Sequence, residues 1–118
     1  MKKILLLLSL FVFSKVTANY DVIQQKPDYV LIPDANFEQA LVDLKIDDVK
    51  DGKLMVVNAL RVQYLEILQK KISCLSGIEA FINLTHLSIQ SNQLTALDVS
   101  NNTKLETLYA YNNQLTSL

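Results

Sequence analysis

The chain has 118 residues, half of them hydrophobic, and its 11 basic and 12 acidic side chains nearly balance. This length suffices for one domain, and a net charge of −1 excludes the basic surface on which nucleic-acid-binding proteins rely. The single cysteine, Cys74, excludes an internal disulfide and is interpreted as a small core residue.

The N-terminus has the features of a secretory signal peptide. A basic start, Met1–Lys3, precedes an apolar run from Ile4 to Phe13, and small residues up to Ala18 offer a cleavage site. The run is too short to span a bilayer as a helix. We therefore expect cleavage after Ala18 and a secreted or cell-surface product without a membrane span. Removal of this segment leaves 8 basic and 12 acidic residues, a net charge of −4.

Residues 19–32 are interpreted as a linker, and residues 33–60 as an N-terminal helical cap with a connecting segment. A helix is predicted over 33–46, with Asp34 as its N-cap. Its apolar residues lie at i, i+3, i+4 and i+7 and form one stripe: Phe37, Ala40, Leu41 and Leu44. Because the terminal repeats of a solenoid need a polar outer face, we expect this helix to cover the first coil.

The stretch from Asp47 to Gly52 predicts an acidic turn. Its acids and glycine partly match a calcium-binding loop, but Val49 and Asn58 stand where that loop needs oxygen ligands and a bidentate glutamate. We therefore predict no metal site here, and no cofactor is expected.

The stretch 54–72 fits two descriptions. Its aliphatic residues match a repeat framework shifted back by 22 positions, with Lys70 where the framework has asparagine. Other apolar residues in the same stretch, among them Val57, Leu60 and Tyr64, have helical spacing. We favour a degenerate first repeat, and a helix stays open as the alternative.

Residues 61–118 contain a repeat of fixed period. The stretch from Leu84 to Leu94 returns 21 residues later, from Leu105 to Leu115, with the framework L-x-x-L-x-L-x-x-N-x-L. This framework is the leucine-rich repeat, which buries its apolar face by stacking on its neighbours. The last coil is incomplete, which predicts exposed strand edges through which the chain could self-associate.

A shorter copy of the motif, from Leu94 to Asn102, lies between the two full copies. The nested copies predict two short strands per coil, one on the concave face and one on the opposite side. Asn92, Asn102 and Asn113 are expected to turn inward and satisfy backbone groups at the corners. The predicted fold is thus an α/β solenoid, a right-handed leucine-rich-repeat coil with short parallel strands and an N-terminal helical cap.

Alternate residues of the predicted inner strands should face outward from the concave sheet. Tyrosines at such positions favour an interface, although they also suit a half-covered sheet. The candidate ligand-binding residues are Tyr64, Glu66, His86, Ser88, Gln90, Thr107, Tyr109 and Tyr111.

His86, Ser88 and Glu66 have the composition of a catalytic triad. An open sheet, however, supplies neither an oxyanion hole nor a substrate pocket. One histidine and one glutamate are also too few to hold a metal ion. No enzymatic activity is predicted.

The repeats, LTHLSIQSNQLTALDVSNNTKLETLYAYNNQLTSL, resemble the 21-residue class of leucine-rich repeat in secreted and cell-surface bacterial proteins. The preceding IPDANFEQALVDLKID and ISCLSGIEAFINL are similar to segments that introduce the repeats in those proteins. The resemblance covers about residues 30–118 and implies a solenoid that binds a protein or glycan at the cell exterior. Two features depart from the family, Lys70 and the end at Leu118 partway through a repeat. The alternative interpretation is therefore a truncated N-terminal fragment of a longer surface protein, with a purely structural capping role.

Overall fold

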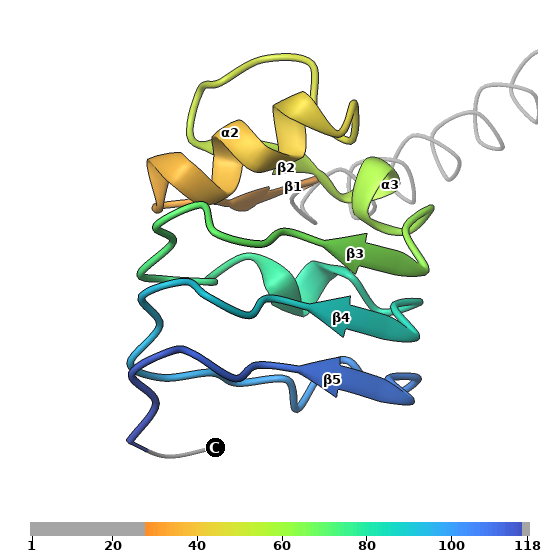
Figure 1. Cartoon of the computed structure of the whole chain (residues 1–118). Coiled ribbons are helices and arrows are strands. Elements are labelled where there is room, and N and C mark those ends of the chain that lie inside the picture. The colour runs from red at the N-terminus through yellow and green to blue at the C-terminus, as the bar shows by residue number, and fades with distance from the viewer. Residues whose placement is uncertain (1–27, 117–118) are drawn as a thin grey trace, which may run out of the picture.

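The computed structural model describes residues 28–116 and shows a stack of coils closed at one end by a helix and a pair of strands (Figure 1). Each coil carries one short strand, and the expected signal peptide lies outside the described residues. The elements in chain order are β1 (Tyr29–Leu31), α2 (Ala35–Asp43), β2 (Lys53–Met55), α3 (Val56–Ala59), β3 (Tyr64–Glu66), the 3-10 helix η1 (Ile78–Ala80), β4 (His86–Ser88) and β5 (Thr107–Tyr109).

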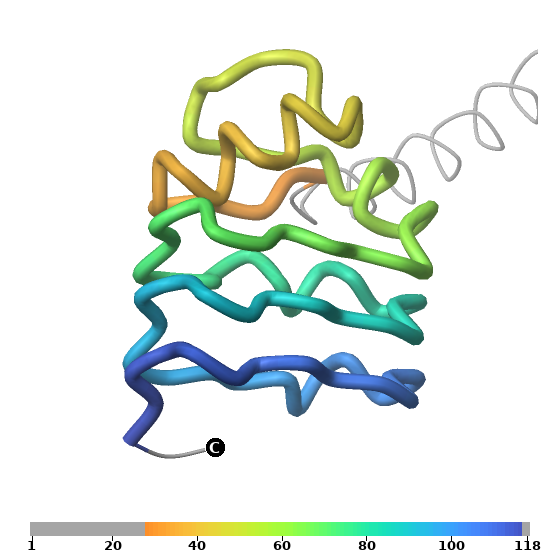
Figure 2. The backbone as a smooth tube through the Cα atoms, in the orientation of Figure 1, coloured from red at the N-terminus to blue at the C-terminus, as the bar shows by residue number. Residues whose placement is uncertain are grey.

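The strands of the coils form a parallel sheet in the order β3-β4-β5. Tyr64 pairs with His86, and His86 pairs with Thr107, at separations of 22 and 21 residues. The backbone trace follows the same period, because each turn of the tube returns one strand further along the stack (Figure 2). One repeat of the sequence therefore corresponds to one full turn of the coil.

The ambiguous stretch 54–72 contains both predicted patterns in succession. The helix α3 is only four residues long and ends at Ala59, before the framework begins. The strand β3 then places Leu65 in the core, and Ile67, the first residue after the strand, is buried as well. The first repeat is thus present, and the helical spacing beyond Ala59 does not produce a helix.

The framework aliphatic residues point inward, as predicted. Leu65 and Leu87 have no exposed surface, and Leu97 is 8% exposed. Full burial of a leucine or isoleucine side chain contributes about 1.5–3 kcal/mol. The same core cluster includes Phe37 and Leu41 of α2, so the helix and the repeats share one interior.

The inward asparagines close the corners of the coils. The amide nitrogen of Asn92 donates to the carbonyls of Ile67 and Ile89, at 2.8 and 2.9 Å, and its oxygen accepts from the backbone N–H groups of Lys70 and Ile72. Asn113 similarly bridges two coils. The predicted role of these asparagines is confirmed, and the coil that has Lys70 instead obtains its hydrogen bonds from Asn92 of the next coil.

The prediction of a second strand in each coil is wrong for the described residues. The stretch 94–102 contains no strand, and the matching part of the first coil contains η1. The amide nitrogen of Asn102 donates to the carbonyls of Ile78 and Phe81, at 2.9 and 3.0 Å. The same two carbonyls also accept from the backbone N–H groups of Phe81 and Leu84 within the first coil.

The N-terminal end differs in one respect from the sequence interpretation. Residues 29–31, assigned to a linker, form β1, which pairs antiparallel with β2 and sets Val30 opposite Leu54. The helix α2 falls inside the predicted range 33–46, and Asp34 caps it by accepting from two backbone N–H groups of its first turn. This end packs directly on the first coil (Figure 1).

Candidate functional site

The outward surface of β3, β4 and β5, here called the strand face, carries a row of aromatic rings, one from each strand. The rings of Tyr64 and His86 are stacked, with centroids 4.1 Å apart and planes 2° from parallel. The edge of Tyr109 meets His86 at 5.6 Å and an angle of 68°. Stacked and edge-to-face pairs of this kind contribute about 0.5–1.5 kcal/mol each beyond their burial. We call these three residues the aromatic row.

The tyrosines of the strand face are open to a partner. Tyr64 is 59% exposed, Tyr109 is 48% exposed and Tyr111 is 60% exposed. Their rings are large and amphipathic, so they present contact area with little rotamer entropy to lose on binding. The aromatic row holds two of the three in a fixed arrangement before any ligand arrives.

Glu66 lies beside the aromatic row and shapes its chemistry. The hydroxyl of Tyr64 donates to Glu66 Oε2 at 3.3 Å. Desolvation, the charge and hydrogen bond of Glu66, and the nearby Tyr109 together raise the pKa of Tyr64 above its ordinary value of 10.0. The hydroxyl therefore keeps its proton at neutral pH and acts as a hydrogen-bond donor.

Ser88 does not belong to the accessible surface that the sequence predicts. Its side chain is only 3% exposed, and its hydroxyl donates to Gln90 Oε1 at 2.6 Å. A small residue between larger outward neighbours is covered by them. Of the other predicted site residues, Glu66 is exposed, whereas His86, Gln90 and Thr107 are half-buried.

The arrangement also lacks the features of a catalytic triad. His86 packs against Tyr64 and Tyr109, and the Ser88 hydroxyl is engaged with Gln90. Within residues 28–116, no group of three His, Cys, Asp or Glu side chains is close enough to hold a metal ion. In the same part of the chain, no helix combines the length and apolar character needed to cross a bilayer.

A hollow of about 520 Å³ adjoins the aromatic row at the junction between α2 and the first coil. It shares Tyr64 and Glu66 with the strand face and adds residues from the end of α2 and from the approach to β3. Sequence reasoning missed it because the two segments meet only in the folded chain. We call it the junction hollow, and its lining residues are Leu44, Ile46, Arg61, Val62, Gln63, Tyr64 and Glu66.

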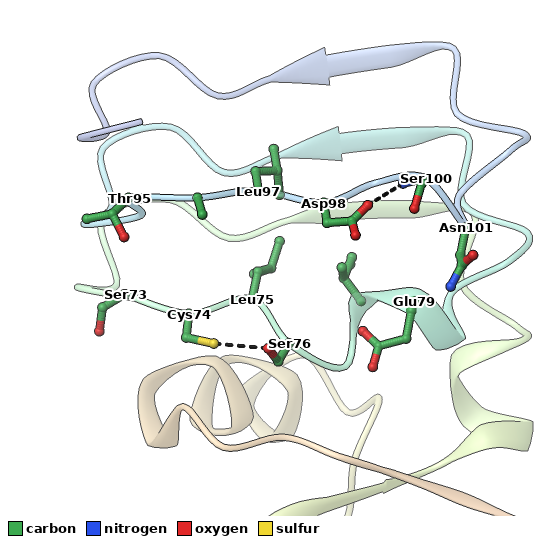
Figure 3. A pocket seen from close by; sticks show the side chains of 12 residues that line it. Ser73, Cys74, Leu75, Ser76, Glu79, Thr95, Leu97, Asp98, Ser100 and Asn101 are labelled. Carbon is green, nitrogen blue, oxygen red and sulfur yellow. Dashed lines mark hydrogen bonds between the residues drawn. The ribbon is translucent and has the colours of Figure 1, made fainter. Parts of the chain in front are cut away.

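A larger hollow, of about 810 Å³, lies between the stretches 73–79 and 95–101, which return the chain between strands (Figure 3). Two carboxylates line this hollow, and each accepts a hydrogen bond from a backbone group two residues away. Glu79 accepts from the Gly77 N–H, and Asp98 accepts from the Ser100 N–H. Hydrogen bonds from Ser100 lower the pKa of Asp98. These carboxylates therefore shape the turns that border the hollow.

Cys74 lies on the edge of this larger hollow and is exposed, contrary to the prediction of a core residue. Its thiol is 3.2 Å from the Ser76 hydroxyl (Figure 3). The core positions of this stretch are Ile72 and Leu75, which flank the cysteine in the sequence. Because Ile72 and Leu75 take the inward positions of this stretch, the side chain of Cys74 points outward although cysteine is small and apolar.

Comparison with proteins of known structure identifies the type of fold. No protein-family model and no curated protein sequence matches the chain. An internalin (inlF) from Listeria monocytogenes matches 75% of the chain at 25% identity and a TM-score of 0.68, and internalin C2 from the same organism matches 75% at 21% identity and a TM-score of 0.66. The functional domain of the internalin InlJ matches 76% at 25% identity and a TM-score of 0.51.

The chain spans only part of these proteins, namely 26% of the first, 39% of the second and 25% of the third. The shared part contains the leucine-rich repeats that the register and the core define. The chain therefore has a leucine-rich-repeat fold of the kind found in the Listeria internalins.

Proposed function

We propose that the chain is an exported, non-catalytic binding module whose strand face contacts a protein or glycan at the cell exterior. The observation that carries the proposal is the aromatic row, in which Tyr64, His86 and Tyr109 stand in contact across three parallel strands. The fold shared with internalins supports a module of this kind. Export rests on the predicted signal peptide with cleavage after Ala18.

The proposal assigns the main contacts to exposed residues. Tyr64, Glu66, Tyr109 and Tyr111 would contact the partner directly, and His86 would hold the two flanking rings in place. Gln90 and Thr107 would contribute at the margin. The coil would follow the right-handed path that parallel crossover connections almost always take, with the strand face on its concave side.

Alanine variants of the three strand-face tyrosines test this proposal. The exported chain would be screened against cell-surface proteins and a glycan array, and the strongest binder would be measured with each variant. We expect Tyr64→Ala, Tyr109→Ala and Tyr111→Ala to weaken binding about tenfold or more, since truncation of a central aromatic contact removes well over 1 kcal/mol.

Tyr29→Ala is the matched control, because this tyrosine is 41% exposed but lies on β1, away from the strand face. It should bind as the unsubstituted chain does. Unchanged binding by all three strand-face variants would remove this face as the site and leave the structural capping role as the better account.

A further inference from the structure

We propose that Asn101 is an acceptor for an N-linked glycan, which the fold presents on the return stretches of the coils. The chain contains two Asn-x-Thr motifs, at 83–85 and 101–103, and neither has proline in its middle position. This motif is the acceptor sequence for N-linked glycosylation, which modifies surface loops of exported proteins. The inference rests on the export included in the proposed function, and it adds a modification site that the binding proposal does not require.

The motif at Asn101 is open to an enzyme. Asn101 and Thr103 are both exposed, whereas Asn102 between them is only 3% exposed. The side chain of Asn102 donates to the carbonyls of Ile78 and Phe81 in the first coil, so it holds this turn on the stack. With the middle residue fixed inward, the carboxamide and the hydroxyl of the motif both lie at the surface.

Asn101 also has room beside it for a sugar. Its side chain lines the larger hollow, and Figure 3 shows it without a hydrogen bond to any other residue drawn. The hollow has a volume of about 810 Å³. The first sugar of a glycan would lie against the stretches 73–79 and 95–101, which run on the other side of the coils from the strands (Figure 3). The strand face would stay free.

The other motif has the same sequence pattern but is engaged by the fold. The side chain of Asn83 is half-buried, its nitrogen donates to the Leu60 carbonyl at 2.9 Å, and its oxygen accepts from Lys104 Nζ at 2.7 Å. The Thr85 hydroxyl donates to the Gln63 carbonyl at 3.0 Å. An enzyme would have to release these contacts before it reached either group. The structure therefore distinguishes two motifs that the sequence presents as equivalent.

The transfer is a substitution at the anomeric carbon of a lipid-linked oligosaccharide. A bond forms between Asn101 Nδ2 and that carbon, and the bond from the carbon to the pyrophosphate oxygen breaks. The lipid pyrophosphate leaves with the electron pair, and the nitrogen gives up one proton to a base of the transferase. The oligosaccharide is the only co-substrate, and nothing is oxidised or reduced.

Glycosylation of the folded chain in vitro tests the selection. The chain is produced in cells that lack N-glycosylation and is incubated with a lipid-linked oligosaccharide and a purified oligosaccharyltransferase that recognises Asn-x-Thr. Peptide mass spectrometry then locates the glycan. We expect it on the peptide with Asn101, and at least about tenfold less on the peptide with Asn83, where three hydrogen bonds must first be released.

A matched pair of variants separates recognition of the motif from other effects. Thr103→Ala removes the hydroxyl and should reduce the glycan at Asn101 to background, whereas Thr103→Ser keeps the hydroxyl and should retain the glycan. Thr103 is exposed, so both variants should fold. Thr85→Ala, in the other motif, should leave the product at Asn101 unchanged.

The same mapping on the chain recovered from the cells that naturally export it shows whether the site is used. A glycan on Asn101 in both experiments supports the inference. No glycan in vitro, more glycan on Asn83 than on Asn101, or equal products from the two Thr103 variants would overturn it. A naturally exported, processed chain without a glycan would overturn it as well.

These outcomes are distinct from failure of the proposed function. A natural chain that keeps residues 1–18 would contradict the predicted export, and the in vitro products then decide the acceptor alone. Tyr64→Ala and Tyr109→Ala lie on the strand face and should leave the glycan products unchanged. Their effect on partner binding therefore tests the strand face separately.

Discussion

At the scale of single residues, Asp34 does the most to join the two parts of the molecule. One carboxylate oxygen accepts from the N–H groups of Asn36 and Phe37 in the first turn of α2, at 2.9 and 3.0 Å. The other accepts from the N–H groups of Ser73 and Cys74, which lie 39 and 40 residues away in the first coil. One side chain thus caps the helix and ties it to the repeats.

Neutralising Asp34 should destabilise the chain in a pH-dependent way. Partial burial acts to raise the pKa of Asp34, but hydrogen bonds from Phe37, Ser73 and Cys74 outweigh it and hold the pKa below 3.8. The stabilisation is therefore present above pH 3.8 and is lost as the pH falls through the lower folded value. At neutral pH, Asp34→Ala should lower the free energy of unfolding by about 2 kcal/mol, since it removes a cap and three further hydrogen bonds, from the Ser73 N–H and hydroxyl and from the Cys74 N–H.

Urea unfolding of the chain and the variant, at pH values from neutral to strongly acidic, measures this difference. The gap in the free energy of unfolding should narrow on acidification. Asp48→Ala, at an exposed carboxylate, is the control and should change the free energy of unfolding by less than about 0.5 kcal/mol. A gap that stays constant down to the lowest pH would contradict the assigned role of the charge.

At the scale of elements, the first coil approaches β1 closely because residue 77 is glycine. Gly77 has φ of 107° and precedes η1. A Cβ there would overlap Ile32 Cδ1 and lie 3.0 Å from the Leu31 carbonyl oxygen. The contact between the turn and β1 therefore depends on the missing side chain as well as on the backbone conformation.

Alanine substitution at the two glycines separates these effects. Gly52 also has positive φ, 83°, but a Cβ there would meet nothing within 4 Å. Gly52→Ala should therefore cost about 1 kcal/mol from the left-handed backbone alone. Gly77→Ala should cost about 2–4 kcal/mol, since overpacking adds to the same strain. Midpoints of urea unfolding compare the two, and equal losses would show that the close approach to β1 is easily relieved.

At the scale of the whole molecule, the interior is one cluster that runs from α2 through the repeats. The equivalent framework residues differ in burial along it. Leu65 and Leu87 have no exposed surface, whereas Leu108 is half-buried. In a stack where each coil contacts only its neighbours, a defect in the middle affects both sides.

The two leucine positions should therefore respond differently to truncation. Leu87→Ala should cost about 2–5 kcal/mol and reduce hydrogen-exchange protection in β3 as well as β5, because its core lies between the two. Leu108→Ala should lower the free energy of unfolding by less, and the loss of hydrogen-exchange protection should be confined to the region of β5. Native-state hydrogen exchange with denaturant unfolding checks both, and a larger loss at Leu108 would contradict the gradient of burial.

The sequence by itself determined the features that follow from local, periodic rules. The period near 21 residues fixed the strand register, the aliphatic spacing fixed the core, and the asparagine positions fixed the corner hydrogen bonds. The N-cap of α2 could also be predicted from the sequence, because capping depends on residues within one turn. The outward tyrosines followed from the alternation of side chains along a strand.

Only the tertiary structure decided which distant segments meet. It paired β1 with β2, covered Ser88, turned Cys74 outward and left the return stretch 94–102 without a strand. It also brought Leu44 and Arg61 together at the junction hollow. These features depend on packing between segments far apart in the chain, and the sizes of neighbouring side chains decide them. The repeat pattern therefore determines the path of each coil, whereas the packing of one coil against the next determines which side chains reach the surface.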